Sequence, residues 1–275
     1  MGWKYLPSDL VPRTRRLTTL GTLFRLHFWQ ATGTSIPQAC DNETAVGDGV
    51  MLSCVPRESL FLTTKINNMN HKHVAEAMEE SLLKLHTDYV DLVLMHWPVS
   101  IDPAREKQTV VYNDWTFIDT WREMENLVES GRARSIGVSN FGIQNFETLL
   151  ASARIVPTVC RVESHVNCPS TELLEFCQSK GIHLTVYASL GSSNSRLADN
   201  GTLQAIARAR NATIQQILLV WALKRGTSVI PKSVTTSLIK GNLDLDGIDL
   251  TCYEMHLLNS LLDRLEVCDG GRVIA

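Results

Sequence analysis

The chain has 275 residues, of which 44% are hydrophobic, so it is long enough to bury one large core. A formal net charge of -3 argues against a nucleic-acid-binding protein, and the short basic run at Arg13, Arg15 and Arg16 is expected to be solvated. The N-terminal stretch lacks the continuous apolar segment of a signal peptide or a membrane span. We therefore expect a cytoplasmic protein that binds neither nucleic acid nor membrane.

The cysteines favour the same compartment. Their number is odd and no two of them form a Cys-x-x-Cys pair, a pattern typical of reduced thiols rather than of disulfides or a metal site. The seven are Cys40, Cys54, Cys160, Cys168, Cys177, Cys252 and Cys268. The sequence thus predicts no metal.

Regular alternation of apolar and amphipathic segments begins near residue 59. An apolar strand is predicted at residues 60–63 and an amphipathic helix at residues 73–86. A buried strand at residues 90–96 follows and ends on His96. A loop of about fifteen residues then leads to a helix around Trp121, and a loop of that length is unusual unless it is functional.

The second half of the chain continues the alternation. Strands are predicted at residues 133–140, 157–164, 182–189 and 227–233. Helices are predicted at residues 143–154, 170–181, 203–208, 214–224, 237–242 and 253–266. Apolar strands that alternate with helices indicate a parallel sheet covered by helices. Six strands follow residue 59 and two more fit before it, so we expect a (β/α)8 TIM barrel in a single domain spanning residues 1–275.

Five of the predicted strands end in polar or aromatic residues that a packed core does not require. These residues are Lys65, His96, Ser139 with Asn140, Tyr187, and Lys232 with Ser233. In a barrel, the carboxyl ends of all strands lie on one face, so these side chains should converge there. A single histidine or lysine at a strand end is more often structural or solvated, but five such ends together favour a functional site.

Several motifs in this order resemble the aldo-keto reductase family. They are DNETAVGDG, LFLTTK, DYVDLVLMHWP, GRARSIGVSNF, YASLGS and VIPKSVT, and they span Asp41 to Asn242. The resemblance implies a TIM barrel that reduces an aldehyde or ketone to the alcohol by hydride transfer from NADPH, with NADH less favoured. It also implies a small-molecule carbonyl substrate and a monomeric protein.

The same resemblance assigns roles to individual residues. Lys65 stands at the position of the family's catalytic lysine, and His96, with Trp97 beside it, at the position that orients the carbonyl. The residues that would bind the cofactor are Ser139 and Asn140 at the carboxamide, Tyr187 stacked on the nicotinamide, Leu190 and Ser192 at the pyrophosphate, Lys232 and Ser233 at the adenosine 2′-phosphate, and Asn242 at the adenine. An amine is a suitable point charge for phosphate.

The segment before Asp41 departs from the family pattern. The position of the tyrosine that donates the proton is Cys40, and that of the aspartate that holds the lysine is Ser35. Residues 23–34 are too few for the helix and strand expected there, since a mean helix of about 11 residues and a strand of about 5 exceed them. We expect residues 1–40 to be divergent, with the first βα unit shortened or disrupted, residues 41–242 to form the matching core, and residues 243–275 to form a C-terminal helix and tail.

Two substitutions affect the predicted cofactor site. The strand that contributes a carboxamide contact in the family reads Cys160-Arg161-Val162-Glu163, and the arginine expected after VIPKSVT is Leu238. Losing that cation weakens the preference for NADPH, although Lys232 remains.

Three interpretations stay open at this level. In the first, the chain is an active reductase, with the Cys40 thiol (pKa about 8.5) or a protonated His96 as the proton donor. In the second, it is a catalytically impaired or inactive barrel that binds a nicotinamide cofactor as a sensor or scaffold. In the third, residues 23–40 reflect a misplaced splice junction or a deletion.

Overall fold

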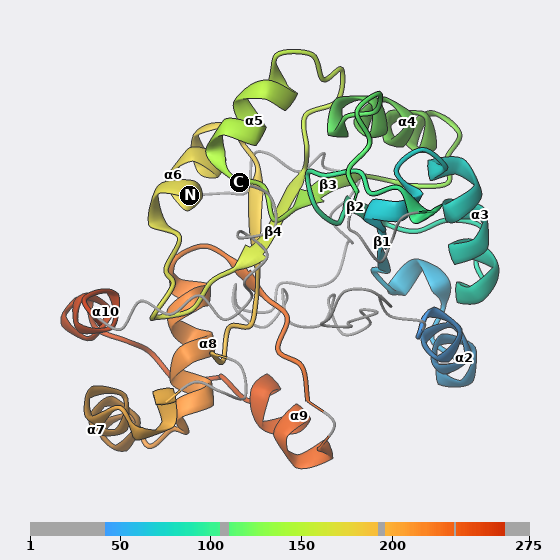
Figure 1. Cartoon of the computed structure of the whole chain (residues 1–275). Helices are drawn as coiled ribbons and strands as arrows, with labels where there is room; N and C mark the ends of the chain where they lie inside the picture. The colour runs from blue at the N-terminus through green and yellow to red at the C-terminus, as the bar shows by residue number, and fades with distance from the viewer. Residues whose placement is uncertain (1–41, 105–109, 192–195, 234, 262–275) are drawn as a thin grey trace. The chain divides into compact units, whose positions relative to one another are not determined.

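The computed structural model describes residues 42–104, 110–191, 196–233 and 235–261 (Figure 1). Features predicted for Ser35, Cys40 and the rest of residues 1–41 lie outside the described residues. Contacts divide the chain into two units, and of the described residues the first contains those up to Cys160 and residues 179–182. The second contains residues 161–178 and the described residues from His183 onward. The prediction of a single domain over residues 1–275 stays a prediction.

The strands of the first unit are parallel and follow one another in chain order. They are β1 (Thr63–Ile66), β2 (Leu92–Met95), β3 (Ile136–Ser139) and β4 (Val159–Glu163), whose first two residues belong to this unit. Strand β1 pairs with β2, and β2 pairs with β3. Buried side chains occupy all positions of β2 and β3, as expected for strands covered on both faces.

The strand predicted at residues 60–63 begins and ends three residues too early in the chain. Strand β1 begins at Thr63, where it pairs with Leu92, whereas Leu62 lies just outside the ladder and its carbonyl accepts hydrogen bonds from the amides of Asp91 and Leu92. An apolar run indicates burial, but the partner strand determines where pairing begins.

Amphipathic helices accompany these strands, and Figure 1 shows α3 and α4 on the same side of β1 to β3. The helices are α2 (Glu43–Ser53), α3 (Val74–Leu85), α4 (Phe117–Glu129) and α5 (Ile143–Leu150), with short 3-10 turns at Arg57–Ser59 and Asn68–Asn70. Helix α4 begins with a capping box, in which the Thr116 amide and hydroxyl both donate to Asp119 Oδ2. Helix α5 ends at Leu150, earlier than the predicted boundary at residue 154.

The described part of the chain begins with helix α2. Together with the turn at Arg57–Ser59 it occupies much of residues 42–59, and no strand lies in this described stretch. The two further strands predicted before residue 59 would therefore have to fall within residues 1–41.

The second unit continues the alternation. The last three residues of β4 belong to this unit. Strands β5 (His183–Tyr187) and β6 (Ser228–Val229) follow β4 in the sheet, and β5 and β6 are parallel. The helices are α6 (Thr171–Ser179), α7 (Gly201–Ala209), α8 (Ile214–Lys224), α9 (Thr236–Leu243) and α10 (Cys252–Asn259), with a 3-10 turn at Arg196–Asp199. Helix α10 ends seven residues before the predicted boundary at residue 266, and residues 262–266 lie outside the described part.

Helix α8 forms the centre of the second unit. Every residue from Ile217 to Leu223 is buried, so the helix is apolar around its whole circumference rather than along one stripe. A capping box between Thr213 and Gln216 fixes its first turn. Its neighbours α7, α9 and β6 cover it.

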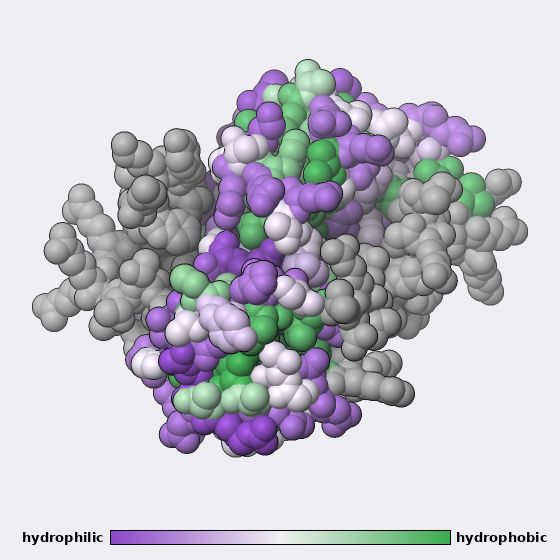
Figure 2. Space-filling model, turned by 90° about the vertical axis from the view of Figure 1, so that its left-hand side faces the viewer, coloured by the Kyte–Doolittle hydropathy of each residue, from purple (hydrophilic) through white to green (hydrophobic). Residues whose placement is uncertain are grey.

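The described surface is mixed in character. On the face shown in Figure 2, hydrophilic residues predominate and hydrophobic residues are interspersed among them. None of the described helices has both the length and the apolarity needed to cross a bilayer. Of the cysteines within the described ranges, Cys54, Cys177 and Cys252 have free thiols.

Candidate active site

Strands β1 and β2 bring Lys65 and His96 together. Lys65 pairs with Leu94, and the amide of His96 donates to the carbonyl of Ile66 at 3.1 Å, so both residues reach the same strand end. Lys65 Nζ lies 3.3 Å from His96 Nε2. The polar strand ends predicted to converge are thus in direct contact at this point.

This contact bears on the tautomer of the imidazole. An ammonium group has only donors, so a hydrogen bond from Lys65 requires His96 Nε2 to accept and places the ring proton on Nδ1. A second ring proton would place like charges 3.3 Å apart. His96 is therefore best described as a neutral ring. Trp97 follows it, with ring centroids 6.3 Å apart.

The end of β3, the third strand end, adds a second polar pair to this site. Asn140 Nδ2 donates to the backbone carbonyl of His96 at 2.9 Å. Asn140 has a φ of 60°, a left-handed conformation that asparagine tolerates better than most residues. Ser139, next to it, is almost completely buried. Three neighbouring strand ends therefore contribute to one polar cluster.

Helix α2 begins beside this cluster through a contact that the sequence did not single out. Thr64 Oγ1 donates to Glu43 Oε1 at 2.5 Å, one residue before Lys65. Glu43 is the first residue of α2, and Asn42 Oδ1 is buried without a partner among the described residues. The threonine in LFLTTK was the available signal, because a buried hydroxyl needs a hydrogen-bond partner.

In the second unit, Tyr187 at the end of β5 faces a buried arginine. The Arg161 guanidinium carbon lies 5.5 Å from the centroid of the Tyr187 ring, and Arg161 is 6% exposed. Two residues further along β4, Glu163 Oε1 lies 3.0 Å from His165 Nε2, and both side chains are buried. The stretch Cys160-Arg161-Val162-Glu163 was identified as a departure from the family pattern, but the pair of Glu163 with His165 was not predicted. No spacing rule signalled this pair, because His165 lies beyond the end of β4 at Glu163.

The loop after β5 has the geometry of a tight turn. Ala188 and Gly191 have φ values of 52° and 80°, and the Gly191 amide donates to the Ala188 carbonyl at 2.7 Å. Ser189 is 1% exposed, and its Oγ has no partner among the described residues. Leu190 is half-buried in the same turn. Ser192, predicted for the same loop, lies outside the described residues.

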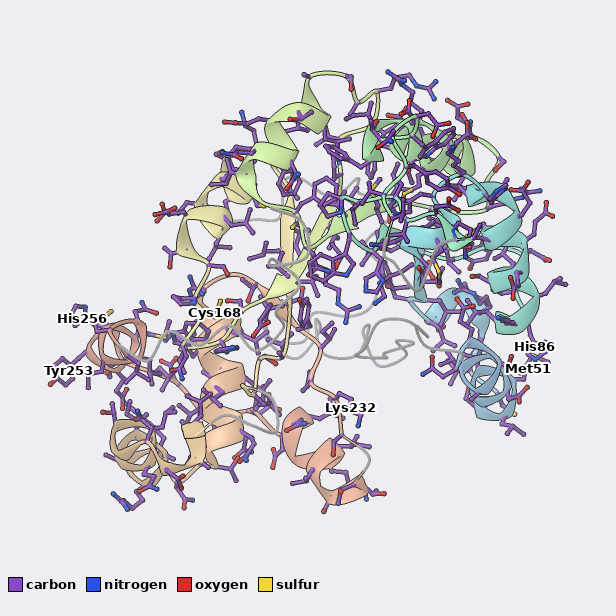
Figure 3. All side chains as sticks on the ribbon, in the orientation of Figure 1. Met51, His86, Cys168, Lys232, Tyr253 and His256 are labelled. Carbon is purple, nitrogen blue, oxygen red and sulfur yellow. The ribbon has the colours of Figure 1, made fainter. Side chains whose placement is uncertain are left out.

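The segment after β6 carries the predicted phosphate-binding residues. Lys232 is exposed on the chain between β6 and α9, where Figure 3 labels it, and Ser233 is half-buried. The Thr235 amide donates to Ser233 Oγ at 3.1 Å. Asn242 is buried in α9, whereas Leu238 on the same helix is 54% exposed. The two ends of this segment thus offer one cation and one buried amide.

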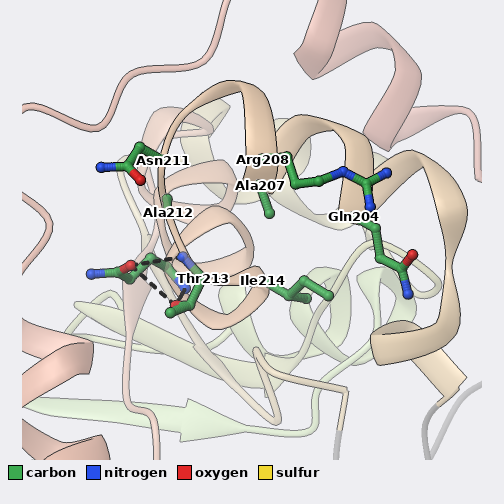
Figure 4. Close-up of a pocket in the computed structure, with 8 residues that line it drawn as sticks. Gln204, Ala207, Arg208, Asn211, Ala212, Thr213 and Ile214 are labelled. Carbon is green, nitrogen blue, oxygen red and sulfur yellow. Dashed lines mark hydrogen bonds between the residues drawn. The ribbon is translucent and has the colours of Figure 1, made fainter.

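A separate hollow of about 600 Å³ lies where α7 is followed by α8 (Figure 4). Gln204, Arg208, Asn211 and Thr213 are among its lining residues. It contains none of the predicted site residues. The described residues also contain no group of three or more histidine, cysteine, aspartate or glutamate side chains suited to hold a metal ion.

Comparisons with a family model and with known proteins point to the same family. A sequence model of the Aldo/keto reductase family matches residues 36–263. A glycerol 2-dehydrogenase (NADP(+)) of Saccharomyces cerevisiae is 39% identical over 229 residues, which are 78% of this chain and 73% of that protein. A D-galacturonate reductase of Hypocrea jecorina is 36% identical over 237 residues, or 82% of this chain and 76% of that protein.

Similar solved structures belong to the same family. The aldose reductase from Schistosoma japonicum superposes with a TM-score of 0.78 at 34% identity, covering 83% of this chain and 78% of that one. An aldo-keto reductase of Bombyx mori in complex with NADP gives a TM-score of 0.77 at 33% identity, covering 84% of this chain and 78% of that one. The predicted class, an α/β barrel built from parallel strands and alternating helices, is confirmed by these similarities.

Proposed function

Because the chain belongs to the aldo/keto reductase family and is an oxidoreductase of that type, we propose that it reduces an aldehyde or ketone to the alcohol with NADPH as its cofactor. The observation that carries the proposal is the contact of Lys65 with His96 at 3.3 Å, joined to Asn140 at the next strand end. Polar residues from three strand ends in one cluster are what a carbonyl site on this fold requires.

The second unit fits a phosphorylated dinucleotide. Ser189 Oγ is buried without a partner among the described residues, in a turn that contains Gly191. Such an orphaned hydroxyl is expected to gain a partner when a ligand binds. Tyr187 offers a half-exposed ring, Lys232 an exposed cation, and Asn242 a buried amide. Lys232 supports NADPH over NADH, although Leu238 replaces the second cation.

When bound, the reduced nicotinamide supplies a hydride to the carbonyl carbon of the substrate. Lys65 keeps a positive charge next to His96, and the carbonyl of His96 is tied to Asn140. The neutral ring of His96, beside Trp97, is suited to orient the carbonyl oxygen. Interactions that are in place before the reaction avoid a reorganisation cost during it.

The proton required by the carbonyl oxygen needs a separate donor. A neutral His96 that accepts from Lys65 is poorly suited to this role. We therefore propose the Cys40 thiol, at the position of the family's tyrosine, as the donor. A thiol is shorter than a tyrosine side chain, and we expect a slow enzyme, because positioned acid catalysis contributes about 10²–10⁴-fold to the rate.

We further propose that the protein works in the cytoplasm as a monomer on a small carbonyl substrate. The free thiols of Cys54, Cys177 and Cys252 support a reducing compartment.

The test combines cofactor binding with turnover. NADPH is titrated by nucleotide fluorescence, and NADPH oxidation is then followed with a panel of aldehydes and ketones. We expect binding and slow turnover in the wild type, and unchanged NADPH affinity with turnover lowered at least about 100-fold in His96→Ala. His256→Ala, on the exposed side of α10, is the matched control and should leave both quantities unchanged.

The other outcomes separate the alternatives. Tight NADPH binding without turnover on any carbonyl would support the non-catalytic barrel instead. Absence of NADPH binding would contradict both interpretations. Unchanged turnover in His96→Ala would remove His96 from the mechanism.

A further inference from the structure

We propose that Arg161 makes the cofactor site distinguish the two redox states of the nicotinamide, because its guanidinium weakens the binding of NADP⁺ relative to NADPH. This inference rests on the proposed function, in which Tyr187 stacks on the nicotinamide ring. It assigns a role in cofactor specificity to a residue at which the chain departs from the family pattern.

The geometry places a permanent charge against the ring of Tyr187. Arg161 lies in β4 and is 6% exposed, with its guanidinium carbon 5.5 Å from the Tyr187 ring centroid. The amide of Ser164 in the same chain segment donates to the carbonyl of Tyr187 at 3.3 Å, so the backbone segments that carry the two side chains are joined here. Arginine does not lose its proton in proteins, and the charge is therefore present at any working pH.

The nicotinamide ring changes charge in the reaction. It is neutral in NADPH and carries one positive charge in NADP⁺. A buried guanidinium next to the stacking residue therefore repels the oxidised ring and leaves the reduced ring almost unaffected. Burial strengthens this repulsion, since water screens it less than at an exposed site.

Among the described residues, a negative group on the same strand is expected to moderate the effect. Glu163 follows two residues after Arg161 on β4 and points to the same side of the strand. Its Oε1 lies 3.0 Å from Nε2 of the buried His165. We therefore expect a moderate discrimination, about tenfold in the ratio of the two dissociation constants, rather than the larger value of an unscreened pair.

The functional consequence concerns the release of the product cofactor. A site that binds NADP⁺ weakly frees it sooner after each turnover and is less inhibited by accumulated NADP⁺. The overall equilibrium of the reaction is unchanged, because a binding preference acts only on enzyme-bound states. Weaker NADP⁺ binding therefore favours turnover in the direction of carbonyl reduction.

The test is the ratio of the NADP⁺ to the NADPH dissociation constant, measured by fluorescence quenching or calorimetry. We expect Arg161→Gln to lower this ratio about tenfold through tighter NADP⁺ binding, and Arg161→Lys, which keeps the charge, to leave it near the wild-type value. Arg225→Gln is the matched control, because this arginine lies 4.6 Å from the Trp221 ring instead and should not affect the ratio.

A second variant keeps the inference testable if Arg161→Gln does not fold. Glu163→Gln removes the moderating charge and retains an acceptor for His165, so the ratio should rise. An unchanged ratio in a folded Arg161→Gln, a loss of discrimination in Arg161→Lys equal to that in Arg161→Gln, or a lower ratio in Glu163→Gln would each overturn the inference. If the wild type binds neither cofactor form, the proposed function itself fails; if it binds both and only the ratio is insensitive, this inference alone fails.

Discussion

His71 shows how burial of a single residue makes stability depend on pH. Its side chain is completely buried, with Nδ1 2.9 Å from Ser100 Oγ, and burial lowers the pKa of the imidazole to about 3. In the unfolded chain the group titrates near its ordinary value of 6.5. Below pH 6.5 the imidazole binds a proton in the unfolded state but not in the folded state. The free energy of unfolding therefore falls as the pH falls toward 3.

We expect this residue to cost about 2 kcal/mol of unfolding free energy between pH 6.5 and 5. Urea unfolding at pH 7 and pH 5, compared between the wild type and His71→Gln, measures the effect. The variant should be less stable at pH 7 but should lose less on acidification. Glu254, whose pKa is lowered to about 2 by Arg210 and Thr251, acts only below pH 4.5 and does not interfere. Equal losses in both proteins would show that His71 is not the titrating group.

At the scale of the elements, Asp91 ties the start of β2 to its neighbours. Its carboxylate is 5% exposed, accepts from the Leu62 amide at 2.9 Å, and lies 2.8 Å from Arg57 and 3.1 Å from Arg134. The two guanidinium groups also cover Tyr89, each 4.1 Å from its ring centroid. One carboxylate thus joins three chain segments at the beginning of the sheet, away from the Lys65 end.

We expect Asp91→Asn to lower the unfolding free energy by about 2–4 kcal/mol, because it removes the negative charge that compensates two partly buried cations and one of the two acceptor oxygens. Glu79→Gln is the control, since Glu79 forms an exposed pair with Arg132 at 2.7 Å and should change stability by less than about 1 kcal/mol. Chemical unfolding of both variants measures the difference. A loss in Asp91→Asn no larger than in the control would contradict this account of the sheet.

The elements also show what periodicity can predict. Helix α3 was predicted because Val74, Met78, Leu82 and Leu85 recur at helical spacing; Leu82 is half-buried and the other three are buried. Strand β1 was misplaced because the apolar run of LFLT does not specify where β2 begins to pair. The ends of α5 and α10 were also missed, since an amphipathic pattern can continue past the last hydrogen-bonded turn.

For the whole molecule, the chain order of the elements was predictable, and so was the meeting of the ends of β1, β2 and β3, whereas individual side-chain contacts were not. Lys65 and His96 were singled out as strand ends, and the register of β1 with β2 places them 3.3 Å apart. The pair of Glu163 with His165, and the approach of Arg161 to Tyr187, depend on side-chain directions that no spacing rule supplies. Positions 35 and 40 lie outside the described residues, so the assignment of the Cys40 thiol as the proton donor is a proposal.

The most direct test of the central claim, hydride transfer from NADPH to a carbonyl carbon, is isotope transfer. NADPH deuterated at the transferable position is incubated with the purified full-length chain and an aldehyde that gives turnover or, failing that, a reactive aromatic aldehyde at high concentration. Mass spectrometry of the product then reports where the label is. We expect one deuterium on the carbinol carbon of the alcohol, and much less labelled product with His96→Ala. Cofactor binding without any labelled alcohol would contradict the claim and identify the chain as a barrel that binds its cofactor but no longer catalyses reduction.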